Sequence, residues 1–420
     1  MNSFSGYFKL SVDERLSVLK KVRNLNDQEI SILKNGGSMD LASADKIVEN
    51  VIGVYHLPIG LATNFKINSK DYVIPLAVEE PSVVAAASKG AKLCLPKGFS
   101  AKSDPPLMIG QIQIMNPTNS KDAISKISSH KSSLLSAANE FLKPKEKYGI
   151  KATDLSATVV SSSRGPIFIA NITVNVGNAQ GANMINSLME FLAPKIHSLI
   201  GGKIRLRILT NLATKRKTYA CATWSKENLT SSEIEGVLDA YAFAESDVYR
   251  CATHNKGIMN GISSAVVASG NDWRSAEAAA HAYAAMSGKY SPLTRYSLLP
   301  NGDLFGEIEL PLALATVGPA VNSSPIAKIT QKILGVSSSG ELAQAIACVG
   351  LANNFSALLA LSGEGIQKGH MKLHGRSVAS FVGASDSEVD ELAKILSDSS
   401  DYSESFAKSS LEKMRKSKKS

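Results

Sequence analysis

The sequence predicts an α+β protein that contains a ferredoxin-like unit and ends in a helical tail. Three observations predict this class. Between residues 105 and 212, strand-like and helix-like patterns follow the order βαββαβ, which is the ferredoxin-like plan. Mixed strand and helix patterns flank this block on both sides. Residues 377–420 are rich in Ser and charge and show a helical pattern.

Six consecutive segments make up the βαββαβ block. Alternating apolar residues predict its strands, and apolar residues at helical spacing predict its helices. The predicted elements are a strand at 107–115, a helix at 120–142, strands at 155–161 and 167–176, a helix at 181–200 and a strand at 203–210. Because all six agree in order, this block is the best-defined unit of the chain.

The flanking segments are predicted more coarsely. Residues 1–50 show two or three short helices, residues 50–78 read as strands, and Pro81 opens a helix that runs to Leu93. Beyond the block, the patterns indicate helices at 233–244, 272–286, 329–334 and 339–361, a loop at 250–261, and strands at 296–299 and 304–310.

Composition limits the class of protein. Of the 420 residues, 44% are hydrophobic and 20% charged, so the chain can bury a substantial core and is expected to form about two to four domains. This excludes wholesale disorder, collagen and a disulfide-dense scaffold. Lys and Arg total 46 against 37 Asp and Glu, a net charge of +9 that suits an anionic partner but is no nucleic-acid signature by itself.

Cysteine spacing and hydropathy predict a cytoplasmic protein. Cys94, Cys221, Cys251 and Cys348 stand far apart and no pair has CxxC spacing, so we expect reduced thiols and no metal. The N-terminus lacks the apolar region of a secretory signal. No window of about 18 residues is continuously apolar, so no membrane span is expected.

The turn at Asn178–Asn183 is a candidate anion site. It follows a predicted strand and opens a predicted helix. Backbone N–H groups at a helix N-terminus favour phosphate, and Gly181 permits close approach. The turn has no GxGxxG pattern, so an ordinary strand-to-helix turn is the alternative interpretation.

Several charged residues are candidates for chemistry on a carbonyl group. Lys256 lies with Arg250 and His254 in one polar segment, and an ammonium held in a dry pocket stabilises an oxyanion, although most lysines are simply exposed. Asp272 precedes a helix, where it is either an N-cap or an acid that tunes a lysine. The adjacent acids Glu79 and Glu80 have two possible roles. They cap the next helix, or one of them, if buried, acts as a catalytic acid.

His370 and His374 have the i, i+4 spacing of two metal ligands on one helix face. No third ligand follows at HExxH spacing, so an acid–base role for His370 is the better interpretation. Taken together, an acid, a lysine, an aspartate, a histidine and a phosphate-binding turn fit hydride transfer to a carbonyl group.

Seven motifs occur along the chain in the order of a known family: ENVIG at 49–53, EPS at 80–82, GAN at 181–183, LTNLA at 209–213, HNKGIMNGI at 254–262, GNDWR at 270–274 and GHMKLH at 369–374. From about residue 10 to 385, the chain thereby closely resembles the soluble second class of 3-hydroxy-3-methylglutaryl-coenzyme A (HMG-CoA) reductases. The missing membrane segment also fits the soluble class.

The resemblance implies a particular domain organisation. A large α+β domain for the acyl-CoA would comprise residues 1–104, with N-terminal helices at 1–50, and 213–375. An inserted ferredoxin-like, nucleotide-binding domain would comprise residues 105–212, and a C-terminal helical flap residues 376–420. The active site would form at the interface of a homodimer.

The implied reaction is the four-electron reduction of (S)-HMG-CoA to (R)-mevalonate and CoA, or its reverse, in mevalonate and isoprenoid metabolism. Two NAD(P)H molecules would act in turn, through mevaldyl-CoA and mevaldehyde. Two alternatives stay open. One is another NAD(P)-dependent oxidoreductase acting on a different acyl-CoA or aldehyde. The other is a nucleic-acid binder, which should carry aromatic residues on two central strands, where only Phe168 is present.

The matched motifs imply four catalytic residues. Lys256 would stabilise the oxyanion, and Glu80 would donate a proton to mevaldehyde. Asp272 would hold both in one charge network, and His370 would protonate the departing CoA thiolate. The resemblance also implies substrate contacts from Ser82, Arg250, Asn260 and Asn354, and dinucleotide contacts from Gly181, Asn183, Asn186 and Asn211.

The chain departs from the family pattern at the dinucleotide site. The family turn usually begins with Asp, whereas Asn178 stands here. NAD-dependent members also place an acid on the adenosine ribose, but this region of the chain carries Lys143, Lys145 and Lys147. Because cations favour a 2′-phosphate that an acid repels, NADPH is slightly favoured over NADH, and mevalonate synthesis over its breakdown.

Overall fold

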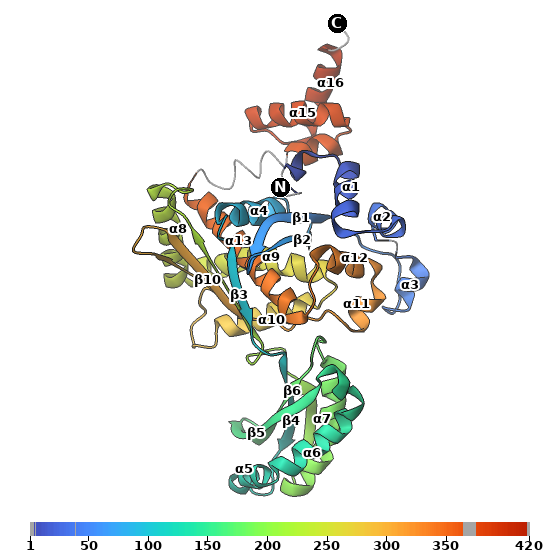
Figure 1. Ribbon diagram of the computed structural model, residues 1–420, viewed down its shortest axis with the longest axis vertical. Helices are drawn as coiled ribbons and strands as arrows, with labels where there is room; N and C mark the ends of the chain where they lie inside the picture. Colours follow the sequence, from blue (N-terminus) through green and yellow to red (C-terminus); the bar gives the residue numbers. More distant parts are fainter. Residues whose placement is uncertain (1–3, 5, 38, 364–374, 418–420) are drawn as a thin grey trace.

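Two separate sheets organise the protein (Figure 1). The computed structural model describes residues 4, 6–37, 39–363 and 375–417. The large sheet has the strand order β2-β1-β3-β8-β10-β9 and the small sheet the order β5-β6-β4-β7. The strands of the large sheet are β1 (Ile59–Ile67), β2 (Lys70–Ala77), β3 (Phe99–Ser103), β8 (Lys217–Trp224), β9 (Thr294–Leu298) and β10 (Leu304–Pro311).

The small sheet belongs to the predicted βαββαβ unit, which is confirmed except that the helix predicted at 120–142 is divided into two helices at His130. Its elements are β4 (Leu107–Met115), α5 (Ser120–Ser129), α6 (Lys131–Leu142), β5 (Lys151–Ser162), β6 (Gly165–Asn175), α7 (Ala182–Ile200) and β7 (Lys203–Leu209). All pairs in the sheet are antiparallel. Every second residue of β4 is buried, including Met108, Ile112 and Ile114, and packs in a core that contains α5, α6 and α7. In Figure 1 this green unit lies below the large sheet.

Helices pack around the large sheet and share its hydrophobic core. They are α4 (Val83–Leu93), α8 (Ser231–Ser246), α9 (Val248–Ala268), α10 (Trp273–Ala284), α11 (Pro319–Ser323), α12 (Pro325–Leu334) and α13 (Ser339–Ser362). Helix α13 contacts both α4 and α9. It approaches α4 closely at Gly90, where an added Cβ would lie 2.2 Å from the carbonyl oxygen of Ala352.

Helix α13 is also long and apolar enough to cross a membrane by length and composition alone. Within this protein, 78% of its apolar window is buried. That burial is typical of the central helix of a globular core.

Smaller helices lie at the two ends of the chain. The N-terminal part contains η1 (Tyr7–Lys9), α1 (Val12–Arg23), α2 (Asp27–Lys34) and α3 (Leu41–Asp45). The C-terminal part contains α15 (Asp386–Ser399) and α16 (Glu404–Ser417), which share a small core of their own, including Leu392, Leu396 and Leu411. In Figure 1 these red helices stand above the large sheet.

Two local predictions are wrong. Residues 250–261 form no loop but part of α9, whose first turn is capped by the side chain of Asp247. The polar residues in this stretch hid its helical period, although Ile258 and Ile262 are fully buried. Pro81 does not open α4 either, because the helix begins at Val83 and Ser82 is its N-cap residue.

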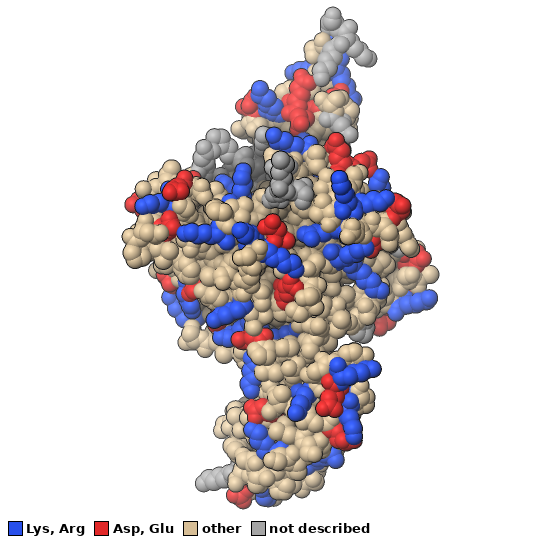
Figure 2. All heavy atoms as spheres, viewed as in Figure 1, with Lys and Arg blue, Asp and Glu red and all other residues tan. Residues whose placement is uncertain are grey.

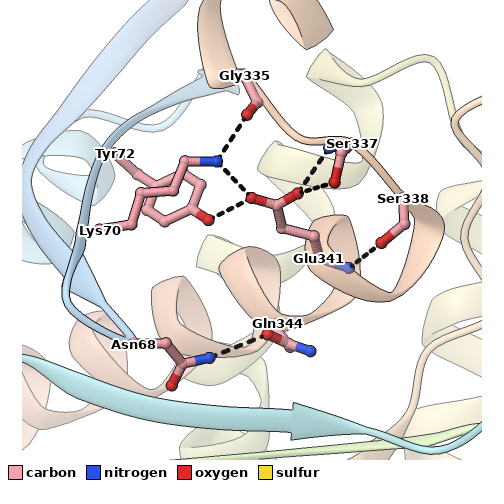
Figure 3. A network of polar contacts seen from close by, with 8 residues as sticks. All are labelled: Asn68, Lys70, Tyr72, Gly335, Ser337, Ser338, Glu341 and Gln344. Atoms are coloured by element: carbon pink, nitrogen blue, oxygen red, sulfur yellow. Dashed lines mark hydrogen bonds and ion pairs between the residues drawn. The ribbon is translucent and has the colours of Figure 1, made fainter.

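A polar network joins the large sheet to the start of α13 (Figure 3). The carboxylate of Glu341 accepts hydrogen bonds from Lys70 Nζ at 2.6 Å, Tyr72 OH, and both the N–H and the hydroxyl of Ser337. Burial raises the pKa of Glu341, but the bonds from Lys70, Tyr72 and Ser337 outweigh it and lower the pKa to about 2.

We predict that Glu341→Gln lowers the free energy of unfolding at pH 7 by about 1–3 kcal/mol. The folded-state pKa is depressed, so the contribution of the carboxylate is present above its ordinary value of 4.5 and is lost as pH falls toward about 2. Denaturant unfolding at several pH values measures this. The gap between wild type and variant should shrink across that range, whereas the exposed Glu227→Gln control should show no gap at pH 7.

Candidate active site

An ion pair between Lys256 and Glu80 forms the centre of the first candidate site. The Nζ of Lys256, on α9, lies 2.6 Å from Oε2 of Glu80, which precedes α4. One turn along α9, Asn260 Nδ2 donates to the other carboxylate oxygen at 3.2 Å. Of the two adjacent acids considered from the sequence, Glu80 is therefore the one held against the lysine.

This ion pair borders a cavity of about 370 Å³. Its walls come from the start of α4, from α9 and from the second half of α13. The lining is largely apolar but carries three cationic side chains, from Lys89, Arg250 and Lys256, against the single acid Glu80. A cavity of this size and charge suits part of an anionic organic ligand.

Two predicted substrate contacts, Ser82 and Arg250, line this cavity with their polar groups available. Ser82 has a left-handed backbone (φ 76°) and its side chain caps no helix N–H. Such a conformation in a non-glycine residue is strained, and strain of this kind is concentrated at functional sites. Burial lowers the pKa of the Arg250 guanidinium, and among the described residues no acid pairs with it.

The predicted contact Asn354 lines the cavity too, but its side chain is buried and already bonded. Its Oδ1 accepts from Thr294 Oγ1 at 3.0 Å and from Tyr296 OH at 2.9 Å. Because the Thr294 hydroxyl donates to Asn354, it accepts from His254 Nε2, 2.6 Å away. Burial, followed by the charge of Arg250, lowers the pKa of His254 to about 3. His254 is therefore neutral at physiological pH and positions Asn354 rather than carrying a charge.

A second, larger cavity of about 1200 Å³ lies between the small and large sheets. The whole turn Asn178–Asn183 lines it, including the predicted contacts Gly181 and Asn183. Gly181 has a left-handed φ of 85°, and an added Cβ would lie 2.6 Å from Val176, so glycine is required at this turn. Lys145 and Lys147 also line the cavity.

Two predicted dinucleotide contacts lie outside the lining of this cavity. Asn186 Oδ1 accepts from the N–H of Leu209 and so ties α7 to β7. Asn211 Oδ1 accepts from Ser275 Oγ on α10. Both side chains hold the elements that frame the cavity.

Asp272 belongs to the second cavity rather than to the Lys256–Glu80 pair. It is the N-cap of α10, with Oδ1 accepting from the N–H groups of Arg274 and Ser275, which is the simpler of the two roles considered from the sequence. Twelve residues of α9 separate Lys256 from Ala268, about 18 Å along the helix. A single chain therefore does not bring Asp272 into the predicted charge network.

The remaining predicted catalytic residue, His370, lies outside the described residues, as does His374. Among the residues that are described, no group of three or more His, Cys, Asp and Glu side chains could hold a metal ion. Sequence reasoning overlooked Lys89 and Asn353 as lining residues of the first cavity. Helical spacing could have indicated Lys89, which lies seven residues after Ser82, but not Asn353, because adjacent helical residues do not share a face.

Comparison with known proteins identifies the family. The family model for hydroxymethylglutaryl-coenzyme A reductase matches residues 11–375. The chain belongs to the hydroxymethylglutaryl-coenzyme A reductase family. The 3-hydroxy-3-methylglutaryl-coenzyme A reductase of Archaeoglobus fulgidus is 45% identical over 413 residues, which cover 98% of this chain and 94% of that protein. A probable reductase of the same name from Borreliella burgdorferi is 33% identical and covers 99% of this chain and 98% of its own.

Solved structures of the HMG-CoA reductase family agree with this fold. A class II enzyme from Streptococcus pneumoniae, bound to NADPH in open conformations, has a TM-score of 0.81 at 38% identity, covering 97% of this chain and all of its own. A second structure from that organism has a TM-score of 0.83 at 37% identity and covers 98% of this chain and 99% of its own. The resemblance found in the motifs, the α+β class and the identification as an NAD(P)H-dependent reductase are thereby confirmed. The comparisons give no support to either alternative.

We predict that Ser82→Gly is more stable than Ser82→Ala by about 1 kcal/mol. Both variants lose the hydroxyl, but only alanine keeps a Cβ in the left-handed conformation. Denaturant unfolding of the two variants side by side measures the difference. Equal midpoints would mean that no strain is stored at this residue.

Proposed function

We propose that the Lys256–Glu80 ion pair is the chemical centre at which (S)-HMG-CoA is reduced to (R)-mevalonate and CoA. The observation that carries the proposal is the 2.6 Å contact between this ammonium and carboxylate at the edge of the first cavity. NAD(P)H supplies hydride when bound. The carbonyl oxygen that becomes negative on hydride transfer needs a preorganised cation beside it, and Lys256 is placed for that role.

Glu80 and Asn260 prepare the lysine for this role. The carboxylate orients the ammonium, and Asn260 fixes the carboxylate from the opposite side. Glu80 is also the one acid among the described lining residues of this cavity, so we assign to its protonated form the proton donated when mevaldehyde becomes an alcohol. Ser82, Arg250 and Asn354 are proposed to hold the hydroxymethylglutaryl group, whose carboxylate suits the unpaired guanidinium of Arg250.

The exposure of Lys256 indicates that a single chain leaves the site incomplete. Its side chain is 59% exposed, and water at that exposure would weaken an electrostatic role. Within the part of the chain that the structure describes, Asp272 lies too far away to help. We therefore propose that a second copy of the chain covers the ion pair and brings its own Asp272 to it.

An exposed apolar surface supports the homodimer. Helix α3 and the segment after it expose the side chains of Leu41 (57%), Ile47 (51%), Val48 (56%), Ile52 (99%) and Tyr55 (85%). Large apolar side chains gathered in one segment mark protein–protein contacts.

Lys and Arg are interspersed with Asp and Glu over the face seen in Figure 2, which shows no single basic patch there.

The second cavity is proposed to bind NADPH, with a slight preference over NADH. Gly181 and Asn183 line it directly, whereas Asn186 and Asn211 are proposed to act by framing it. Lys145 and Lys147 supply two cations to a cavity whose lining has one acid, Asp272. An adenosine 2′-phosphate would find cations there, as the sequence suggested. Mevalonate synthesis rather than breakdown is the proposed direction.

The domain boundaries are part of the proposal. Residues 1–104 and 213–375 would hold the acyl-CoA, residues 105–212 the nucleotide, and residues 376–420 would close over the site as a flap. The separate core of the small sheet and the separate core of α15 and α16 support this division. His370, just before the flap, would protonate the CoA thiolate. The four free cysteines fit a cytoplasmic enzyme.

We predict that Lys256→Ala and Asp272→Ala each abolish turnover as homodimers, but that a mixture of the two regains activity. Subunit exchange gives heterodimers in which one site carries both changes and the other carries neither. Activity should return to about a quarter of the wild-type rate for a random mixture. HMG-CoA-dependent loss of nicotinamide absorbance measures this, and no recovery after demonstrated exchange would contradict the shared site.

We predict that the double variant Lys145→Gln, Lys147→Gln loses about tenfold in kcat/KM for NADPH and much less for NADH, because two cations near a 2′-phosphate are removed. Initial rates with both nucleotides measure this. Lys143→Gln is the matched control, since Lys143 pairs with Glu140 and does not line the cavity. Equal losses for both nucleotides would contradict NADPH selection by these lysines.

A further inference from the structure

Arg216 is a buried cation at the junction of the two sheets. It lies in the connection from β7 to β8 and is only 4% exposed. Its Nη1 donates to the carbonyl oxygen of Ala179 at 3.2 Å, and its Nη2 donates to the carbonyl oxygen of Leu314 and to Ser339 Oγ at 3.1 Å. The guanidinium thus joins the turn that lines the second cavity to the large domain.

No carboxylate neutralises this guanidinium among the residues that the structure describes. Burial lowers the pKa of Arg216 to about 10, so it still carries its charge at neutral pH. A buried cation bonded only to neutral acceptors is costly, because carbonyl and hydroxyl groups compensate for lost hydration less well than an acid does.

Asn178 shares a hydrogen-bonding partner, Ser339, with Arg216. Its Oδ1 accepts from the N–H of Ser339 at 3.0 Å, in the first turn of α13, and Ser339 also contacts Arg216. The backbone of Asn178 is fixed as well, since its carbonyl oxygen accepts from the N–H of Thr316 at 3.0 Å. The neutral amide therefore accepts a hydrogen bond at the start of α13, as a carboxylate could, but it does not neutralise the charge of Arg216.

The turn separates this charge from the second cavity. Arg216 donates to the carbonyl oxygen of Ala179 but does not line the cavity, whereas Asn178 and the residues up to Asn183 do. The turn itself, residues 177–183, contains no charged side chain. An anion in the cavity would thus lie one layer of backbone away from a positive charge that no group of the described chain balances.

We propose that Arg216 is a positioning residue for the dinucleotide: it fixes the turn at Ala179 and leaves a positive charge beneath it that the phosphates of the nucleotide balance. This inference rests on the proposed use of the second cavity by NAD(P)H. At a separation of about 10 Å and an effective dielectric constant of about 20, one such charge changes anion affinity about tenfold.

Asn178→Asp is the sharpest test, because it adds an acid beside Arg216 and at the start of α13 with almost no change of shape. We expect the variant to unfold at a higher temperature than wild type, since it pairs a buried cation and caps a helix with a charge. We expect its dissociation constants for NADPH and NADH, measured by nicotinamide fluorescence without acyl-CoA, to rise about tenfold. If Arg216 had a purely structural role, a variant that unfolds at a higher temperature would not also bind the nucleotide more weakly.

Asn26→Asp is the matched control. Asn26 caps α2 through Oδ1, which accepts from the N–H of Glu29 at 2.8 Å, and it does not line the second cavity. The same substitution there should leave nucleotide binding unchanged. Nucleotide binding by Asn178→Asp within twofold of wild type, or tighter, would overturn the proposal.

Two substitutions of Arg216 cover the case in which Asn178→Asp does not fold. Arg216→Lys keeps the charge and should bind NADPH more tightly than Arg216→Gln, with a steeper dependence on salt. Equal affinity and equal salt dependence in these two variants would overturn the proposal. Failure of the proposed reaction is distinguishable, because it would leave wild type binding the nucleotide without turning over HMG-CoA.

Discussion

The contact between Lys256 and Glu80 is the interaction on which the rest of the structure depends. The lysine comes from the middle of α9 and the acid from the segment before α4. Their distance is set by the buried face of α13, which packs against both helices and lets α4 approach at Gly90. The large core thus holds two opposite charges together at the edge of a cavity, where neither helix alone could place them.

Sequence patterns predicted the small domain well and the site helix poorly, for a physical reason. In β4, β6 and α7 one face of each element meets a single core, so apolar residues keep a regular period. Helix α9 instead packs buried residues such as Ile258 on one side and presents Arg250, Lys256 and Asn260 to a cavity on the other. The polar residues that line the cavity break the apolar pattern of α9, so the sequence wrongly predicted a loop there.

Distances between motifs were beyond the reach of the sequence. Sixteen positions separate Lys256 from Asp272, and only the length of the helix between them shows that one chain keeps them apart. Likewise, the sequence places Asn178 only at the start of a candidate anion-binding turn. The structure shows that the amide caps α13 beside Arg216. The separation of Lys256 from Asp272 and the contacts of Asn178 with Ser339 both depend on the folded structure, so the sequence alone could not predict them.

Among the described residues, the two cavities have no lining residue in common, and this matters for a reaction that needs two hydrides. The first cavity is built from α4, α9 and α13, whereas the second is built from α6, residues 145–150, the 178–183 turn, α7 and residues 270–272 and 315–321. A spent nucleotide has to leave and a fresh one enter while the half-reduced intermediate stays bound. Separate supporting elements allow that exchange without disturbing the Lys256–Glu80 pair. The proposed completion of the site by a partner subunit fits the same separation, because different parts of the chain line the two cavities.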